Sequence, residues 1–142
     1  MLRILVIDDS PLRIDLLRQW MPDDVHAVYS TSAGRAMKLI DLDPGTVYAG
    51  IMLDHDLDQQ VAVEAEHDFT GRDVARRIVL RIPRDVPVLV HSTNWSGAAS
   101  MHHTLEAAGF AVTRIRFDDL TRERCLDWLQ EVRAEWQYRT DQ

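Results

Sequence analysis

Short apolar runs alternate with longer amphipathic segments along the chain, and this alternation most constrains the fold. The apolar runs predict strands at residues 3–7, 25–29, 47–53, 86–91 and 110–117. The segments between them carry apolar residues at helical spacing and predict helices at 12–20, 32–42, 72–81, 96–108 and 121–138. Continuous apolar strands that alternate with helices are typical of a parallel sheet covered on both faces. We therefore expect a three-layer α/β fold of (βα)5 type, forming a single domain over residues 1–142.

Composition narrows the classes of function. The chain has 142 residues and a net charge of −7, which disfavours non-specific binding to the phosphate backbone of nucleic acids. The apolar runs fall short of the roughly 20 residues that a membrane helix needs. A predicted strand begins almost at Met1, and the single cysteine, Cys125, cannot form an internal disulfide. We therefore expect a cytoplasmic protein that does not bind membranes.

Polar residues follow three of the predicted strands directly. In parallel α/β folds, ligands bind just beyond the carboxyl ends of the strands, so these residues are the candidates for a site. They are Asp8 and Asp9 after the first strand, Asp54, His55 and Asp56 after the third, and His91, Ser92 and Asn94 after the fourth. Carboxylates that converge at one edge repel each other, and a hard divalent cation with oxygen ligands relieves that repulsion. The pattern thus predicts a cation held by Asp8, Asp9, Asp54 and Asp56.

A simpler interpretation of the first pair is that Asp8 and Asp9 only cap the helix that follows them. Ser10 or Asp9 suits an N-cap, and Pro11 suits the first turn of a helix. Capping does not explain Asp54, which follows a different strand.

This arrangement resembles the receiver domain of response regulators over nearly the whole chain. The likeness rests on Asp8-Asp9, Asp54, Gly71 and Ser92 at their places in the strand–helix alternation. It implies a flavodoxin-like receiver fold with sheet order 2-1-3-4-5. It also implies that Asp8 and Asp9 hold Mg²⁺, with Mn²⁺ as the alternative, that Asp54 is the nucleophile that accepts a phosphoryl group, and that Ser92 donates a hydrogen bond to that group.

Two features depart from the receiver pattern. Receivers carry a lysine after the fifth strand, whereas the only lysine of this chain is Lys38, in the second predicted helix. Arg114 or Arg116 would supply charge there, but a guanidinium is not the same compact donor. The connection after the third strand is also long and acidic, with a loop insertion at 58–70, and loops of this kind are lids, binding loops or disordered segments.

The strings Leu53-Asp54-His55-Asp56-Leu57 and His91-Ser92-Thr93-Asn94 resemble a divergent branch, the cyclic-phosphate-processing receiver-like domains. Opening a cyclic phosphodiester needs an activated water, charge neutralisation and a proton for the leaving alkoxide. Carboxylate-held metal supplies the first two, and a histidine supplies the proton. His55 and His91 are the candidate proton donors, although strand alternation turns His91 away from the face that Ser92 and Asn94 share. Asn94 would bind a phosphate oxygen or a ribose hydroxyl.

Three functions fit these features. The first is a metal-dependent hydrolase or binder of a small phosphorylated ligand of nucleotide type, with Asp54, His55, His91 and Ser92 as catalytic residues and Ser92 and Asn94 as ligand-binding residues. The second is a phosphorelay receiver with Asp54 as phospho-acceptor. The third is a degenerate receiver that binds a protein. The last helices would serve a homodimer or a protein partner, and Trp95 would either stack on a base or pack in the core.

Overall fold

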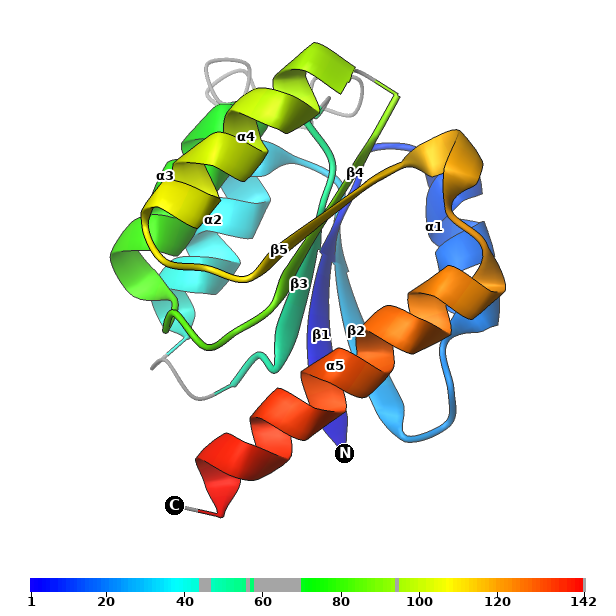
Figure 1. Cartoon of the computed structure of the whole chain (residues 1–142). Coiled ribbons are helices and arrows are strands. Elements are labelled where there is room, and N and C mark those ends of the chain that lie inside the picture. The colour runs from blue at the N-terminus through cyan, green and yellow to red at the C-terminus, as the bar shows by residue number, and fades with distance from the viewer. Residues whose placement is uncertain (44–46, 56, 58–69, 94, 142) are drawn as a thin grey trace.

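The computed structural model describes residues 1–43, 47–55, 57, 70–93 and 95–141 (Figure 1). Strands and helices alternate through these residues in the order the sequence predicts. The strands are β1 (Leu2–Ile7), β2 (Val25–Ser30), β3 (Gly50–Leu53), β4 (Val88–Ser92) and β5 (Val112–Arg116). The helices are α1 (Pro11–Trp20), α2 (Ala33–Leu42), α3 (Gly71–Arg81), α4 (Trp95–Ala107) and α5 (Arg122–Thr140), with a short 3₁₀ helix, η2 (Phe117–Asp119), before α5.

The sheet has five strands in the order β2-β1-β3-β4-β5 within the described chain, and the strand pairs are parallel. The predicted fold is therefore confirmed. The register pairs Ile7 with Leu53 on the neighbouring strand and Ser92 with Arg116. Because all strands run in the same direction, the residues after β1, β3 and β4 lie along one edge of the sheet.

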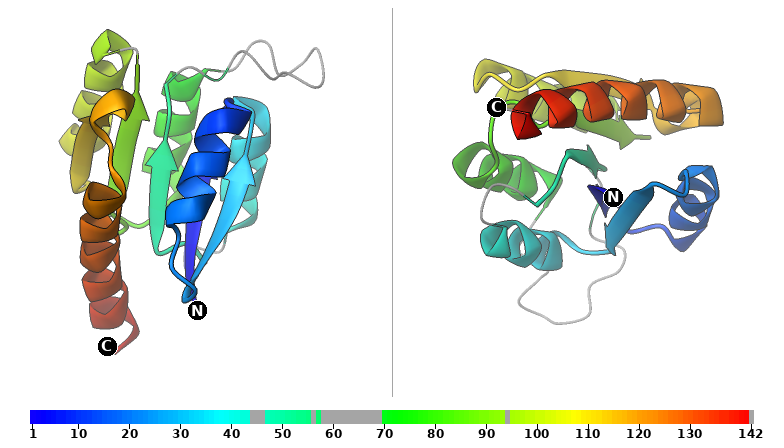
Figure 2. Two further views of the ribbon diagram at one scale, coloured as in Figure 1. Left: turned by 90° about the vertical axis from the view of Figure 1, so that its right-hand side faces the viewer. Right: turned by 90° about the horizontal axis from the view of Figure 1, so that it is seen from below.

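Helices cover both faces of the sheet (Figures 1 and 2). On one face, α2, α3 and α4 pack over a buried cluster that includes Leu5, Ile51, Val90, Ile78 and Leu105. On the other face, α1 and α5 pack over Val6, Met52, Leu89, Leu17 and Leu129. Successive residues of one strand enter opposite clusters, as the two-residue period of a strand requires. Packing in these two buried clusters fixes the positions of the strands. The residues at the carboxyl ends of the strands are then the ones that can form a functional site.

The first helix begins immediately after the Asp8-Asp9 pair. The Ser10 side chain accepts a hydrogen bond from the backbone N–H of Arg13 at 3.3 Å, and Pro11 occupies the first turn. The N-cap is thus Ser10, one of the two residues that the sequence offered. This start places the first turn of α1, including Arg13, beside the carboxyl end of β1.

The third strand is shorter than predicted, because residues 47–49 precede it without strand pairing. Ala49 and Tyr48 are nevertheless buried, which explains why the sequence pattern extended the strand over them. The predicted loop insertion at 58–70 lies outside the described residues except for Thr70, which caps α3. Among the described residues, no helix combines the length and the apolarity needed to cross a bilayer.

Candidate functional site

Three carboxylates meet at the carboxyl edge of the sheet. Asp8 and Asp9 follow β1, Asp54 follows β3, and all three side chains are buried. One carboxylate oxygen from each lies within 4.8 Å of the others. Buried carboxylates at this spacing repel each other strongly unless a cation balances them. The central strands thus build a cluster of negative charge that requires positive charge nearby.

Arg13 supplies positive charge to this acidic cluster from the first turn of α1. Its Nη2 donates to Asp54 Oδ2 at 2.7 Å and lies 3.4 Å from Asp9 Oδ1. Its Nε donates to Asp8 Oδ1 at 3.2 Å. The Arg13 side chain is only 17% exposed, and its guanidinium carbon lies 5.3 Å from the ring centroid of Phe117. The guanidinium therefore touches all three acids at once.

The pKa values of Asp8 and Arg13 reflect this mutual support. Burial would raise the pKa of Asp8, but the hydrogen bond and electrostatic interaction with His91, the Ser10 backbone N–H and Arg13 bring it below its ordinary value. Burial would lower the pKa of Arg13, but the charges of Asp54, Asp8 and Asp9 raise it instead. Both groups are therefore held in their charged forms at neutral pH.

His91 contacts the acidic triad from β4. Its Nε2 lies 2.9 Å from Asp8 Oδ2, and both side chains are fully buried. Because a carboxylate only accepts, the proton of this hydrogen bond is on Nε2. His91 Nδ1 has no hydrogen-bond partner among the described residues. Strand alternation does turn His91 to the face opposite Ser92, as expected, yet on that face it reaches Asp8.

His55 lies on the other side of the site, at the junction of α3 and α4. A Cβ atom built on Gly97, in the first turn of α4, would stand 2.5 Å from three atoms of the His55 ring. A Cβ on Gly71, the first residue of α3, would stand 2.6 Å from the backbone oxygen of His55. Two glycines thus allow α3 and α4 to approach His55 closely, and they fix both its backbone and its ring.

The β4–β5 end of the edge carries a serine and a basic cluster. Ser92 ends β4 and is fully buried. Trp95 begins α4, and the guanidinium carbons of Arg114 and Arg116 lie 4.4 Å and 5.1 Å from its ring centroid. Neither arginine forms an ion pair with Asp54 among the described residues, whereas Arg13 does.

Two predicted site residues, Asp56 and Asn94, lie outside the described residues. Their predicted roles in holding the cation and the ligand stay predictions. Of the other predicted residues, the structure brings Asp8, Asp9, Asp54 and His91 into one connected group.

Arg13 was missed by the sequence interpretation, which searched for a cation after the fifth strand. The available signal was positional. Arg13 stands four residues after Asp9 and one turn into a helix whose start Ser10 fixes, so its side chain can reach back to the strand end.

The donor set suits a hard divalent cation. Three buried carboxylates offer the oxygen ligands that Mg²⁺ and Mn²⁺ prefer, and they outnumber the single guanidinium that contacts them. Asp8, Asp9 and Asp54 are therefore the residues that would hold such an ion.

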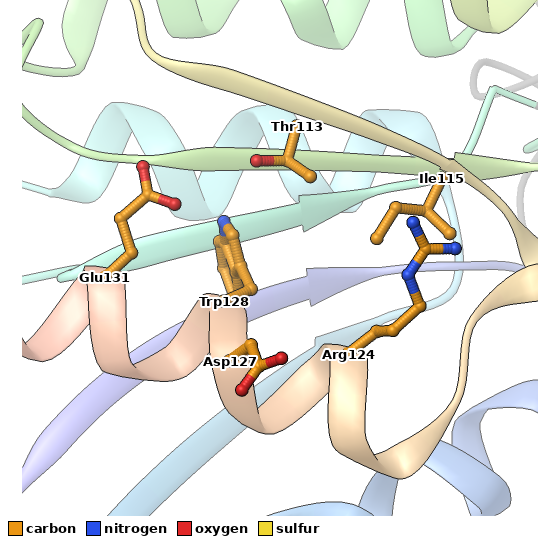
Figure 3. Close-up of a pocket in the computed structure, with 6 residues that line it drawn as sticks. All are labelled: Thr113, Ile115, Arg124, Asp127, Trp128 and Glu131. Carbon is orange, nitrogen blue, oxygen red and sulfur yellow. The ribbon is translucent and has the colours of Figure 1, made fainter.

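A separate groove of about 240 Å³ lies between β5 and α5 (Figure 3). Its lining includes Thr113 and Ile115 from β5 and Arg124 and Trp128 from α5. None of the carboxylates of the edge site lines it, so the groove is distinct from that site.

Comparison with solved structures identifies the fold. The signal receiver domain of a Luxo repressor protein from Vibrio parahaemolyticus is 17% identical, with 99% of this chain and 96% of that chain covered at a TM-score of 0.73. The response regulator domain of Thermotoga maritima CheB is 18% identical, with coverage of 96% and 97% and a TM-score of 0.66. The receiver domain of the sensor histidine kinase PA1611 from Pseudomonas aeruginosa, solved with magnesium in its active-site cleft, is 16% identical, with coverage of 91% and 94% and a TM-score of 0.66. The fold is that of a response-regulator receiver domain.

The family follows from a sequence model. The model of the cyclic-phosphate processing receiver domain matches residues 3–107, and the chain belongs to this family. The matched residues include Asp8, Asp9, Arg13, Asp54 and Ser92, and end before β5. Comparison with curated proteins found no match.

Proposed function

We propose that this domain hydrolyses a cyclic phosphodiester of nucleotide type at the carboxyl edge of its sheet, with a divalent cation held by Asp8, Asp9 and Asp54. The observation that supports it best is the buried acidic triad with Arg13 and His91 in direct contact. The family description supplies the substrate class. A bound Mg²⁺ or Mn²⁺ would neutralise phosphate charge and lower the pKa of a coordinated water.

In this proposal, Arg13 and His91 hold the carboxylates in place. Arg13 fixes the oxygens of Asp54 and Asp8 through hydrogen bonds at 2.7 Å and 3.2 Å. His91 orients Asp8 through its Nε2, since hydrogen bonds from neighbouring groups hold metal-binding carboxylates in position. We therefore assign His91 a positioning role and leave the proton transfer to His55.

Ser92 and His55 act on the ligand. The hydroxyl of Ser92, at the end of β4, donates to a phosphate oxygen, while the ring of His55, held against Gly97, delivers a proton to the leaving alkoxide. An imidazole titrates near neutral pH, so it serves as a general acid where carboxylates alone do not. Opening the ring breaks one P–O ester bond, adds hydroxide from water to phosphorus and places the proton on the departing oxygen.

The direct test is turnover of adenosine 2′,3′-cyclic and 3′,5′-cyclic phosphate by the purified protein with Mn²⁺ or Mg²⁺. We expect Asp54→Asn to abolish turnover, whereas Asp15→Asn, which alters an exposed carboxylate on α1, leaves it unchanged. We expect His55→Ala to reduce turnover about 10²- to 10⁴-fold with little change in metal affinity. Absence of turnover for both substrates, with metal bound, would refute the proposed reaction.

A second candidate is phosphorelay signalling, which the buried position of Asp54 directly after β3 favours. Arg13 rather than a strand-five lysine contacts Asp54, so we expect small phosphodonors to leave no long-lived acyl phosphate. Intact-mass measurement after incubation with acetyl phosphate distinguishes the two functions. A stable adduct that changes the oligomeric state would favour signalling.

A further inference from the structure

Trp95, Arg114 and Arg116 form a cluster, here called the arginine–tryptophan cluster, at the β5 end of the sheet edge. The two guanidinium carbons lie 4.4 Å and 5.1 Å from the centroid of the same indole ring. The arginines are two residues apart on β5, so they project from the same face of the strand. Trp95 is partly buried against the core beneath α4. The indole ring is therefore a fixed support for two cations.

The cluster lies next to Ser92. The register pairs Ser92 with Arg116 across β4 and β5, and neighbouring strands are about 5 Å apart. Ser92 also shares its face of the sheet with Val90, which packs beneath α2, α3 and α4, the same face on which Trp95 packs. Trp95 itself stands three residues after Ser92. A group bound at Ser92 thus has the cluster as its immediate neighbour on the β5 side.

Among the residues that the structure describes, no acid pairs with the two arginines of the cluster. Within the described part of the chain, Arg114 and Arg116 form no ion pair, whereas Arg13 contacts three carboxylates and Arg133 pairs with Asp24. Two such cations side by side are notable in a chain of net charge −7. A guanidinium that stacks on an aromatic ring keeps its in-plane N–H donors for a carboxylate or a phosphate. The cluster therefore offers preorganised donors for an anion.

We propose that the arginine–tryptophan cluster is a second anion subsite, which binds a phosphate joined through a nucleoside to the phosphate held at Ser92. The inference rests on the proposed function and specifies its substrate as a nucleotide or short oligonucleotide end that carries at least two phosphates. The cluster fits a phosphate rather than a base, because the indole ring on which a base would stack is already contacted by its own two arginines.

Adenosine 3′-phosphate and adenosine 3′,5′-bisphosphate test this subsite, because they differ only in the second phosphate. Calorimetric titration with Mg²⁺ present gives both dissociation constants. We expect the bisphosphate to bind about tenfold more tightly or better, since its second phosphate accepts charge-assisted hydrogen bonds from the two guanidinium groups. In the Arg114→Gln/Arg116→Gln variant, the ratio of the two constants should fall to about one, because the added donors are gone.

The matched control replaces two other stacked arginines. Arg84 lies over Phe110 before β4 begins, and Arg139 lies over Trp136 at the end of α5, both away from the carboxyl edge of the sheet. The Arg84→Gln/Arg139→Gln variant carries the same loss of charge and should keep the preference for the bisphosphate. A preference that disappears in this control as well would show a general charge effect and overturn the proposal.

Turnover of adenosine 2′,3′-cyclic phosphate, measured in parallel, separates the two proposals. Turnover without preference for the bisphosphate, or a preference that survives Arg114→Gln/Arg116→Gln, overturns the subsite alone. A preference that depends on the cluster without turnover refutes the reaction and supports the subsite. Arg114→Lys/Arg116→Lys serves as a second variant, with charge kept and the planar donors lost, and should retain only part of the preference.

Discussion

The two halves of the carboxyl edge of the sheet differ in how their charged side chains are paired. In the β1–β3 half, three buried carboxylates face one partly buried guanidinium at distances between 2.7 Å and 3.4 Å. In the β4–β5 half, two arginines stack on Trp95, and no described carboxylate pairs with them. Charges buried together depend on each other, because each one left alone pays the full cost of desolvation. Arg116 is exposed and Arg114 is half-buried, so their charges depend less on a partner within the protein and are available to a ligand.

This contrast predicts where a substitution alters the stability of the protein and where it alters ligand binding. The β1–β3 half should be sensitive in both respects, because its charges are buried and also hold the proposed cation. The β4–β5 half should affect ligand affinity with little effect on folding.

The largest expected effect comes from Arg13→Ala. It leaves three buried carboxylates without their guanidinium, and breaking a buried ion pair costs about 3 kcal/mol of unfolding free energy. Urea unfolding without divalent ions measures the loss. Added Mg²⁺ or Mn²⁺ should stabilise the variant more than the native protein, since the cation then replaces the missing charge and binds only the folded state.

Arg13→Lys serves as the control, because it keeps a cation but loses the fork that contacts several acids. It should lie between the native protein and Arg13→Ala in stability. If Arg13→Ala were as stable as the native protein without metal, the carboxylates would not depend on Arg13 and the contrast between the two halves would fail.

The next largest effect concerns one of the contacts between the halves, where His55 from the β3 end packs on Gly97 of α4. A methyl group at Gly97 would stand 2.5 Å from the ring, so Gly97→Ala should displace the His55 side chain. We expect cyclic-phosphodiester turnover to fall about tenfold or more, as expected for a misplaced general acid. Metal affinity should be unchanged.

A double-mutant cycle isolates this effect. In the His55→Ala background, Gly97→Ala should have no further effect on turnover, because the ring that it displaces is absent. Additive losses would mean that Gly97→Ala acts on something other than His55. The melting temperature of each variant controls for a general loss of structure.

The strand ends allowed much of this site to be predicted from sequence. Asp8, Asp9 and Asp54 each follow a buried apolar run, and parallel strands bring such residues to one edge. The fold was also predictable, because the strands appear as continuous apolar runs and the helices between them carry apolar residues at helical spacing. The catalytic roles of these residues stay predictions.

Other features depended on side-chain geometry that no periodicity encodes. Arg13 reaches the triad only because Ser10 begins α1 where it does, and His91 reaches Asp8 although it points away from the face of Ser92. Trp95 was left between base stacking and packing, and the structure packs it against the core with two arginines over its ring. The bounds of β3 were too long because buried residues that precede a strand look like the strand itself.

A smaller effect is expected from pH, through Asp8. Its pKa is lowered in the folded protein, so the ionised carboxylate stabilises the fold above its unfolded pKa of 3.8, and that contribution is lost as pH falls through the lower, folded value. Below about pH 4, unfolding free energy should therefore fall more steeply for the native protein than for Asp8→Asn. Denaturant unfolding at several pH values measures both slopes. Equal slopes would show that His91 and Arg13 do not stabilise the ionised form.

The smallest effect on stability is expected from Arg114→Gln/Arg116→Gln. Neither guanidinium is paired with a described carboxylate, and the stacking contacts with Trp95 at 4.4 Å and 5.1 Å join an exposed Arg116 and a half-buried Arg114 to the ring. Exposed cation–π contacts contribute roughly 0.5–1 kcal/mol each, and removing positive charge from an acidic chain adds slight repulsion. The double variant should therefore lose about 1 kcal/mol in urea unfolding, well below the loss for Arg13→Ala, with no dependence on Mg²⁺. A loss as large as that of Arg13→Ala would mean that the cluster is part of the structural framework of the edge, and the two halves would then differ in position only.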